Sequence, residues 1–261
     1  MQERRMGNNF LFGRRKRLCS SLEVDRILTK NGILTIDDVF NSGLPLQGSL
    51  KKLGNRHDNR DVRRLTIKDG SVEIHLYIKR QWRPTRYIPR TIDIRTGLWR
   101  STPVNEWRGL HLLRGIGLNT AEPWALFQGV LTDARSAIII RALPVSSSLD
   151  FLLREDAALL RETGGVEMLS RNIVQIFMQL FSANLTWRSA TAKHIYPEKI
   201  DSQNWKLWLL DCEGVHANIS SKDKRRCVRN FIESVSKVDA EGYFTEKLCA
   251  DLSLIDCRKN S

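Results

Sequence analysis

The hydrophobic pattern of the chain changes its period near residue 145, and this change constrains the fold more than any other feature. Before it, the apolar side chains of residues 72–78 occupy every second position, as one face of a β-strand does. After it, apolar residues recur at three- and four-residue spacing over residues 166–180, as one face of a helix does. The segment 145–147 reads as a short linker. A strand-rich half followed by a helix-rich half predicts an α+β fold in two lobes.

A hairpin is the clearest element of the first half. Residues 62–67 and 72–78 are expected to form its strands, joined by a turn at Asp69-Gly70. Successive side chains of a strand point to opposite faces, so Lys79 is expected on the face opposite the apolar residues. A third strand is expected over residues 136–143.

Helix signals follow the same division. Ser101 begins a pattern typical of a helix start, and Gly115 and Gly117 are typical of its end, which places Glu106 in the first turns. In the second half we expect a helix from Ser148 to Glu162 and another over residues 166–180. Beyond them the pattern predicts an irregular segment over residues 187–199, and then an apolar strand over residues 205–210 that ends at Asp211.

The polar residues at the ends of these elements suit phosphoryl transfer. That reaction needs a cation on the donor phosphates, a carboxylate to hold the cation, a carboxylate for Mg²⁺, and a group that positions the attacking hydroxyl. The chain offers candidates in this order and with the approximate spacing of kinases. They are Lys79, Glu106, Arg188 with Ser189 and His194, and Asp211.

Two segments resemble the lipopolysaccharide-core kinases, which phosphorylate Kdo or heptose sugars. Residues 104–108, Val-Asn-Glu-Trp-Arg, are similar to an Asn-Glu-Trp segment of that family, and residues 187–196 are similar to its catalytic loop. The family has His-Arg-Asp there, and a His five residues after the Asp. Arg188 and the run Lys193-His194-Ile195 fit this loop, whereas Trp187 and Ser189 depart from it. The resemblance spans residues 38–230 and implies a two-lobed protein-kinase-like fold.

The resemblance also implies a role for each candidate. Lys79 would hold the phosphates of ATP, Glu106 would orient Lys79, and Asp211 with His194 would hold Mg²⁺. Arg188 belongs to the catalytic loop, in which Ser189 stands where the family has its catalytic Asp. A serine hydroxyl does not accept a proton at neutral pH. The acceptor would be a hydroxyl of the lipopolysaccharide inner core, phosphorylated at the cytoplasmic face of the inner membrane.

Two other functions stay open at this point. A nucleotide-binding pseudokinase would keep Lys79, Glu106 and Asp211 but use nucleotide binding to regulate a partner. A basic nucleic-acid-binding protein is the third class. The phosphate-binding loop is not located by the sequence, since Gly43, Gly48 and Gly54 lack the G-x-G-x-x-G spacing.

Charge indicates an anionic partner. The 261 residues include 42 Lys and Arg against 29 Asp and Glu, a formal net charge of +13. Such a surface speeds the encounter with anionic lipids, phosphorylated sugars or nucleic acid. The densest basic stretch joins the hairpin to the next helix, and its cations alternate with aromatic residues; it comprises Arg80, Arg83, Arg86, Arg90, Arg95 and Arg100 with Trp82, Tyr87 and Trp99. Its arginines suit phosphate groups, but no recognised nucleic-acid module accompanies them, so nucleic acid is the least favoured partner.

The remaining composition places the protein inside the cell. Five scattered cysteines without a C-x-x-C pair argue for a reducing compartment. No run approaches the ~20 apolar residues of a membrane span, and the N-terminal apolar patch is too short for a signal peptide. We therefore expect a cytoplasmic protein with peripheral contact to the inner membrane. The expected division is a basic, partly disordered arm over residues 1–33, an N-lobe over residues 34–144 and a C-lobe over residues 145–261.

Overall fold

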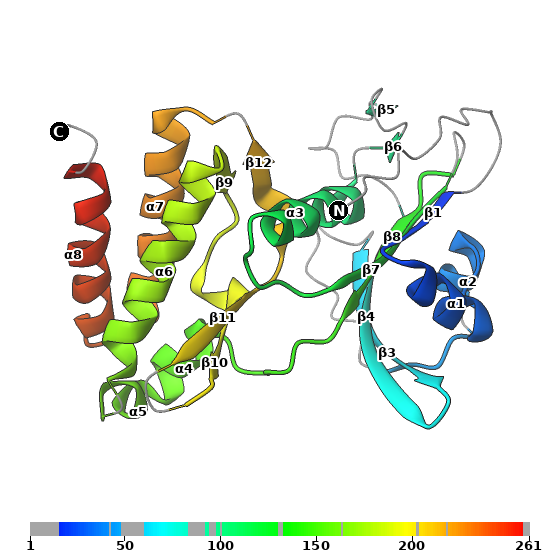
Figure 1. Ribbon diagram of the computed structural model, residues 1–261, viewed down its shortest axis with the longest axis horizontal. Coiled ribbons are helices and arrows are strands. Elements are labelled where there is room, and N and C mark those ends of the chain that lie inside the picture. The colour runs from blue at the N-terminus through cyan, green and yellow to red at the C-terminus, as the bar shows by residue number, and fades with distance from the viewer. Residues whose placement is uncertain are drawn as a thin grey trace.

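The structure is a computed structural model of the whole chain. It describes residues 16–41, 43–47, 60–82, 92–93, 98–99, 101–129, 133–162, 164–201, 204–217 and 219–257. Within these ranges the molecule has a sheet-rich part and a helix-rich part, with one helix lying between them (Figure 1). We call the two parts the N-lobe and the C-lobe.

The N-lobe is built on a six-stranded antiparallel sheet with the order β1-β7-β8-β4-β3-β2. The strands β3 and β4 form the expected hairpin around Gly70, whose φ of +62° suits a residue without a side chain. A separate two-stranded sheet pairs β5 with β6. The strands are β1 (Lys16–Cys19), β2 (Leu46–Gln47), β3 (Arg60–Asp69), β4 (Val72–Gln81), β5 (Ile92–Asp93), β6 (Leu98–Trp99), β7 (Pro123–Gln128) and β8 (Ser136–Arg141).

Helices cover both faces of the main sheet. The helices α1 (Leu22–Lys30) and α2 (Ile36–Phe40) lie on the outer face, and α3 (Thr102–Gly115) lies on the face toward the C-lobe (Figure 1). The strand β8 shows why two cores form. Its Ile139 belongs to the outer core, whereas Ile138 and Ile140 belong to the core shared with the C-lobe. Alternation along β4 places Lys79 on the α3 side, opposite the apolar residues of that strand.

Two parts of the N-lobe differ from the sequence-based expectation. We expected a basic, partly disordered arm over residues 1–33. The described part of this segment contains β1, which pairs with β7, and α1, which buries Val24, Ile27 and Leu28. The strand β7 was missed, although all six of its residues are buried, because a short apolar run without alternation carries no period. The lobe boundary at residue 145 stays a proposal and falls between β8 and α4.

The C-lobe consists of helices with short two-stranded ribbons between them. The expected helix from Ser148 to Glu162 is interrupted at Asp156 and forms α4 and α5, whereas the helix with the apolar stripe forms α6 as expected. The segment expected to be irregular contains short regular elements. The helices are α4 (Leu149–Glu155), α5 (Ala157–Glu162), α6 (Gly165–Ser182), α7 (Ser221–Ser236) and α8 (Tyr243–Cys257). The other elements are β9 (Leu185–Trp187), η1 (Ala192–His194), β10 (Ile195–Lys199), β11 (Trp205–Leu209), η2 (Cys212–Gly214) and β12 (Val215–Ala217).

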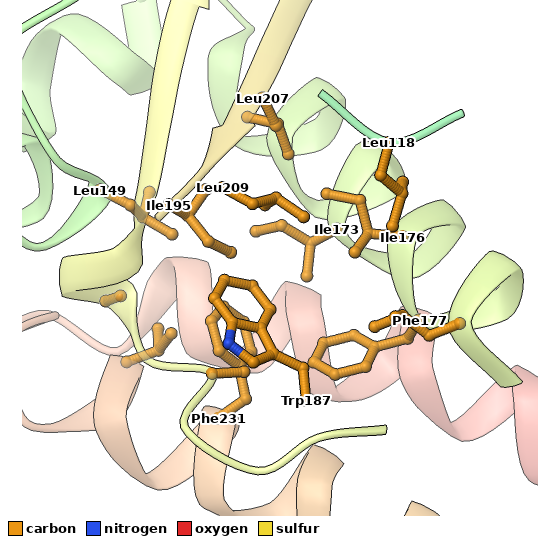
Figure 2. Packing of buried hydrophobic residues seen from close by; sticks show 14 of the residues in the cluster. Leu118, Leu149, Ile173, Ile176, Phe177, Trp187, Ile195, Leu207, Leu209 and Phe231 are labelled. Carbon is orange, nitrogen blue, oxygen red and sulfur yellow. The ribbon is translucent and has the colours of Figure 1, made fainter. Parts of the chain in front are cut away.

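The C-lobe core closes around one tryptophan. Figure 2 shows the ring of Trp187 among Ile173 and Phe177 of α6 and Phe231 of α7. Trp187 is 1% exposed, and the rings of Phe177 and Phe231 meet edge to face with centroids 5.4 Å apart. Since Trp187 begins the loop that leads to His194, the largest side chain of this core fixes the start of that loop.

Among the described residues, none of the helices combines the length and the apolar character needed to cross a bilayer.

The α6 stripe should supply much of the C-lobe's stability. Phe177 is 2% exposed, so Phe177→Ala is expected to lower the free energy of unfolding by about 3–5 kcal/mol. Met178, the next residue of the same helix, is 41% exposed, and Met178→Ala should change it by no more than about 0.5 kcal/mol. Urea unfolding followed by circular dichroism measures both, and equal effects would contradict the packing described here.

Candidate active site

A buried ion pair joins the sheet to α3. The ammonium of Lys79, on β4, donates to Oε1 of Glu106 at 2.6 Å. Ser101 starts α3 by accepting a hydrogen bond from the Val104 amide, and this start places Glu106 in the second turn, facing the sheet. The Glu106 side chain is 1% exposed and that of Lys79 is 19% exposed. The predicted contact between Lys79 and Glu106 is therefore present in the structure.

Charge keeps Lys79 protonated. Burial alone lowers the pKa of its ammonium, but the carboxylates of Glu106 and Asp211 outweigh burial and hold the pKa above its usual value. The second oxygen of Glu106, Oε2, is buried and has no hydrogen-bond partner among the described residues. Buried carboxylate oxygens normally accept a hydrogen bond, so this atom is an open acceptor beside Lys79.

Asp211 follows the apolar strand β11 and adopts a left-handed backbone conformation, with φ 58° and ψ 56°. Its carbonyl oxygen accepts two hydrogen bonds, from the indole nitrogen of Trp187 at 3.2 Å and from the hydroxyl of Ser189 at 3.1 Å. These bonds hold an uncommon conformation that Asp tolerates better than most residues. They also aim the carboxylate so that Oδ1 lies 3.9 Å from the Lys79 ammonium.

His194 faces the same carboxylate. Its Nδ1 lies 2.7 Å from the carbonyl oxygen of Ser189, which can only accept, so Nδ1 carries the hydrogen. In the neutral imidazole this leaves a lone pair on Nε2, which lies 3.2 Å from Oδ2 of Asp211. Two electron-rich atoms that face each other across this distance suit a cation held beside them.

The residues present fit a weakly held divalent cation. Asp211 is about one-third exposed, and together with His194 it offers two protein ligands. Within the described ranges no group of three His, Cys, Asp or Glu side chains is arranged to hold a metal. Mg²⁺ is commonly bound by one or two carboxylates plus substrate phosphates rather than by a full protein cage. The donor set at Asp211 therefore matches Mg²⁺ that arrives with a nucleotide.

These groups line one cavity of about 220 Å³ between the lobes, which brings together Lys79, Glu106, His194 and Asp211. The wall also contains residues that the sequence analysis did not single out, among them Arg60 and Glu213. Their side chains pair across the lobes at 3.3 Å, and burial together with Asp211 raises the pKa of the Glu213 carboxyl. The position of Glu213 two residues after Asp211 was the signal that could have identified it.

Two predicted residues do not face the cavity. The Ser189 hydroxyl is directed at the Asp211 carbonyl, and Gly214 packs so closely on it that a Cβ at Gly214 would lie 2.5 Å from Ser189 Oγ. Arg188 turns away and pairs with Asp223 at the start of α7 at 2.8 Å. The roles predicted for Ser189 and Arg188 thus stay predictions, and their contacts here are structural.

Only part of the basic stretch after the hairpin lies within the described residues. Arg80 was expected to offer its guanidinium to an anion, but that group is buried in an ion pair with Asp61 and lies over the rings of Phe40 and Trp82. That expectation was wrong, because the strand directs Arg80 into the N-lobe interior. The other arginines of the stretch and two of the candidate glycines fall outside the described residues: Arg83, Arg86, Arg90, Arg95, Arg100, Gly48 and Gly54.

A sheet lobe and a helical lobe with a Lys–Glu pair and an Asp–His pair between them define a protein-kinase-like class of protein. The chain belongs to the lipopolysaccharide kinase (Kdo/WaaP) family, whose model matches residues 50–245. A solved structure, WaaP in complex with acyl carrier protein, matches with a TM-score of 0.61 over 91% of this chain and 88% of that chain, at 12% identity. No curated protein matches the sequence. The two-lobed protein-kinase-like fold predicted from the sequence is confirmed.

The distance between α3 and the loop after Asp211 should be sensitive to one methyl group. A Cβ at Gly109 would lie 1.9 Å from the carbonyl oxygen of Cys212, so Gly109→Ala must push α3 away from this loop. We expect a loss of about 1–3 kcal/mol in the free energy of unfolding, the usual effect of overpacking, measured by chemical denaturation.

Gly115 of the same helix provides the control. A Cβ there meets nothing within 4 Å, so Gly115→Ala should leave stability unchanged or raise it by up to about 1 kcal/mol. If Gly109→Ala behaved in the same way, the close approach of α3 to Cys212 would be wrong.

Proposed function

We propose that the protein is an ATP-dependent kinase that phosphorylates a hydroxyl of a Kdo or heptose sugar in the lipopolysaccharide inner core. The observation that carries the proposal is the Lys79–Glu106 pair at 2.6 Å, with the Asp211 carboxylate 3.9 Å from Lys79 in one cavity between the lobes. Membership of the lipopolysaccharide kinase family supports the choice of acceptor.

Each residue has a role in this proposal. Lys79, kept protonated by its two carboxylate neighbours, binds the donor phosphates, and Glu106 holds Lys79 in place. Asp211 and His194 hold Mg²⁺, which when bound offsets the negative charge of the phosphates. The reaction needs little covalent chemistry from the protein, so positioning and charge carry most of the catalysis.

Ser189 limits the rate in this proposal. The family has its catalytic Asp at this place, and the Ser189 hydroxyl donates to the Asp211 carbonyl instead of facing the cavity. A general base contributes about 10²–10⁴-fold to such reactions, so a chain without one can still turn over slowly. Glu198 lies in the strand after this loop, but it accepts a hydrogen bond from the Trp208 indole at 2.7 Å and does not line the cavity, so it does not replace the missing base.

A nucleotide-binding pseudokinase is the second candidate. It is favoured by the same contact of Ser189, which serves the backbone of Asp211 and needs no chemistry. In that case the pair of Lys79 and Glu106 would hold a nucleotide that regulates a partner protein. Peripheral contact with the inner face of the inner membrane is proposed for either function, since the formal net charge of +13 favours anionic surfaces.

Nucleotide binding should depend both on the pair of Lys79 and Glu106 and on Asp211. Lys79→Met with Glu106→Gln removes the ion pair without leaving a buried charge, and it should weaken MgATP binding at least about tenfold, the equivalent of one charged hydrogen bond. Asp211→Ala should abolish the dependence of ATP binding on Mg²⁺. Isothermal titration calorimetry with and without Mg²⁺ measures both effects.

An exposed lysine of the neighbouring strand serves as the control. The Lys68 side chain is 70% exposed, so Lys68→Met should bind MgATP as the unsubstituted protein does. A binding constant that none of these substitutions changes would place the nucleotide elsewhere.

Replacing Ser189 tests the missing base. Ser189→Asp is expected to raise the rate of phosphoryl transfer to a lipopolysaccharide-core acceptor by up to about 10²–10⁴-fold, because a carboxylate can accept the proton of the attacking hydroxyl. Ser189→Asn is the matched control, since its amide has a similar size and can donate to the Asp211 carbonyl but is not a base. Radiolabelled ATP and purified core acceptor measure both variants.

The outcomes separate the two functions. Slow transfer by the unsubstituted protein that disappears in the Lys79 variant supports a kinase. ATP binding without transfer to any core acceptor, in the unsubstituted protein and in Ser189→Asp alike, supports the pseudokinase.

A further inference from the structure

A second cavity, of about 710 Å³, lies on the C-lobe. Its floor is apolar and comes from three helices that lie side by side on the side of the molecule away from the sheet (Figure 1). Phe181 stands at the end of α6, Val228 and Ile232 lie on α7, and Leu252 lies on α8. We call this cavity the α7 groove.

The rim of the α7 groove is strongly basic. Lys222, Arg225, Arg226 and Arg229 line it, and all four are exposed. Their three- and four-residue spacing places them on one face of the helix, where like charges oppose helix formation. Such a row of cations destabilises its helix slightly, and bound counter-charges would remove this cost.

Few carboxylates form ion pairs with these cations. Glu233 also lines the groove, and one of its oxygens lies 3.7 Å from the Arg229 guanidinium. Over the ranges that the structure describes, Lys222, Arg225 and Arg226 have no carboxylate partner. The groove therefore combines an apolar floor with a basic rim on which, among the described residues, three of the four exposed cations lack a carboxylate partner.

We propose that the α7 groove docks the protein on a membrane surface that displays anionic lipid headgroups. Guanidinium groups form paired hydrogen bonds with phosphate, and the apolar floor can take the adjoining part of the lipid that water does not solvate. This floor favours a lipid surface over nucleic acid, which presents charge and bases but no aliphatic chain.

The position of α7 connects the groove to the candidate active site. Asp223, in the first turn of α7, accepts a hydrogen bond from Arg188 of the loop between β9 and η1 at 2.8 Å. The docked helix would therefore hold this loop near the lipid surface. The proposal concerns binding alone and does not depend on catalytic turnover.

Vesicle co-sedimentation of the full chain tests the proposal. The protein is expected to bind vesicles of phosphatidylcholine with phosphatidylglycerol, and not vesicles of phosphatidylcholine alone. Each cation near an anionic surface strengthens binding about fivefold, so Arg225→Glu with Arg226→Glu should weaken it at least about tenfold. Thermal unfolding should show that this variant is folded; if it is not, Arg225→Gln with Arg226→Gln replaces it and should weaken binding about half as much on a logarithmic scale.

A charge-matched variant separates the groove from overall charge. Arg64 and Lys68 lie four positions apart on β3. Because every second side chain of a strand points to the same face, they share one exposed face of that strand. Arg64→Glu with Lys68→Glu changes the net charge by the same amount and should bind vesicles like the unsubstituted protein. ATP binding, measured on the same samples, reports separately on the nucleotide site.

Three results would overturn the proposal. One is equal loss of vesicle binding in both double variants, which would mean diffuse charge attraction. Another is equal binding to both kinds of vesicle. The last is binding of free inorganic phosphate or of an acidic protein at α7, with no binding to anionic vesicles.

Discussion

The ion pair of Lys79 and Glu106 is the contact on which the geometry of the cavity between the lobes depends. It costs free energy to bury both charges, and removing one partner typically costs about 3–5 kcal/mol more. The pair is therefore tolerable only while β4 and α3 stay in register with each other and with Asp211, whose carboxylate shares the Lys79 ammonium. A packed apolar pair would hold the two elements equally well. The presence of an ion pair here is thus better explained by ligand binding than by the stability of the fold.

The C-lobe core fixes the other side of the cavity. Trp187 has two functions. Its ring fills the core beside Phe177 and Phe231 (Figure 2), and its indole nitrogen donates a hydrogen bond to the carbonyl of Asp211. In the sequence, Trp187 stands where the resembled family has His. In the structure the indole of Trp187 supplies a nitrogen donor to the carbonyl of Asp211. Ser189 adds a second donor to the same carbonyl.

Much of the fold and site followed from local patterns. Alternation along β4 placed Lys79 on the correct face, and the serine start of α3 placed Glu106, because both signals depend only on neighbouring residues. The strands and side-chain contacts that depend on residues far away in the sequence were not predicted. The strands β1 and β7 carry no distinctive period, and Arg80 looks like a surface cation until Asp61 is found beside it. The direction of the Ser189 hydroxyl was equally hidden, since Asp211 is 22 residues away along the chain.

The left-handed backbone of Asp211 affects how this protein could evolve. At a φ of 58° sterics favour glycine, asparagine and aspartate over most other residues before any chemistry is considered. Mutational drift at this position is thus confined even in a chain that no longer needs a metal. Persistence of the aspartate in descendants would say little about whether phosphoryl transfer is still under selection. Lys79 has ordinary strand geometry, so a lineage that lost the ligand would be free to replace Lys79 together with Glu106. Whether descendants keep this pair therefore says more about continued ligand binding than whether they keep Asp211.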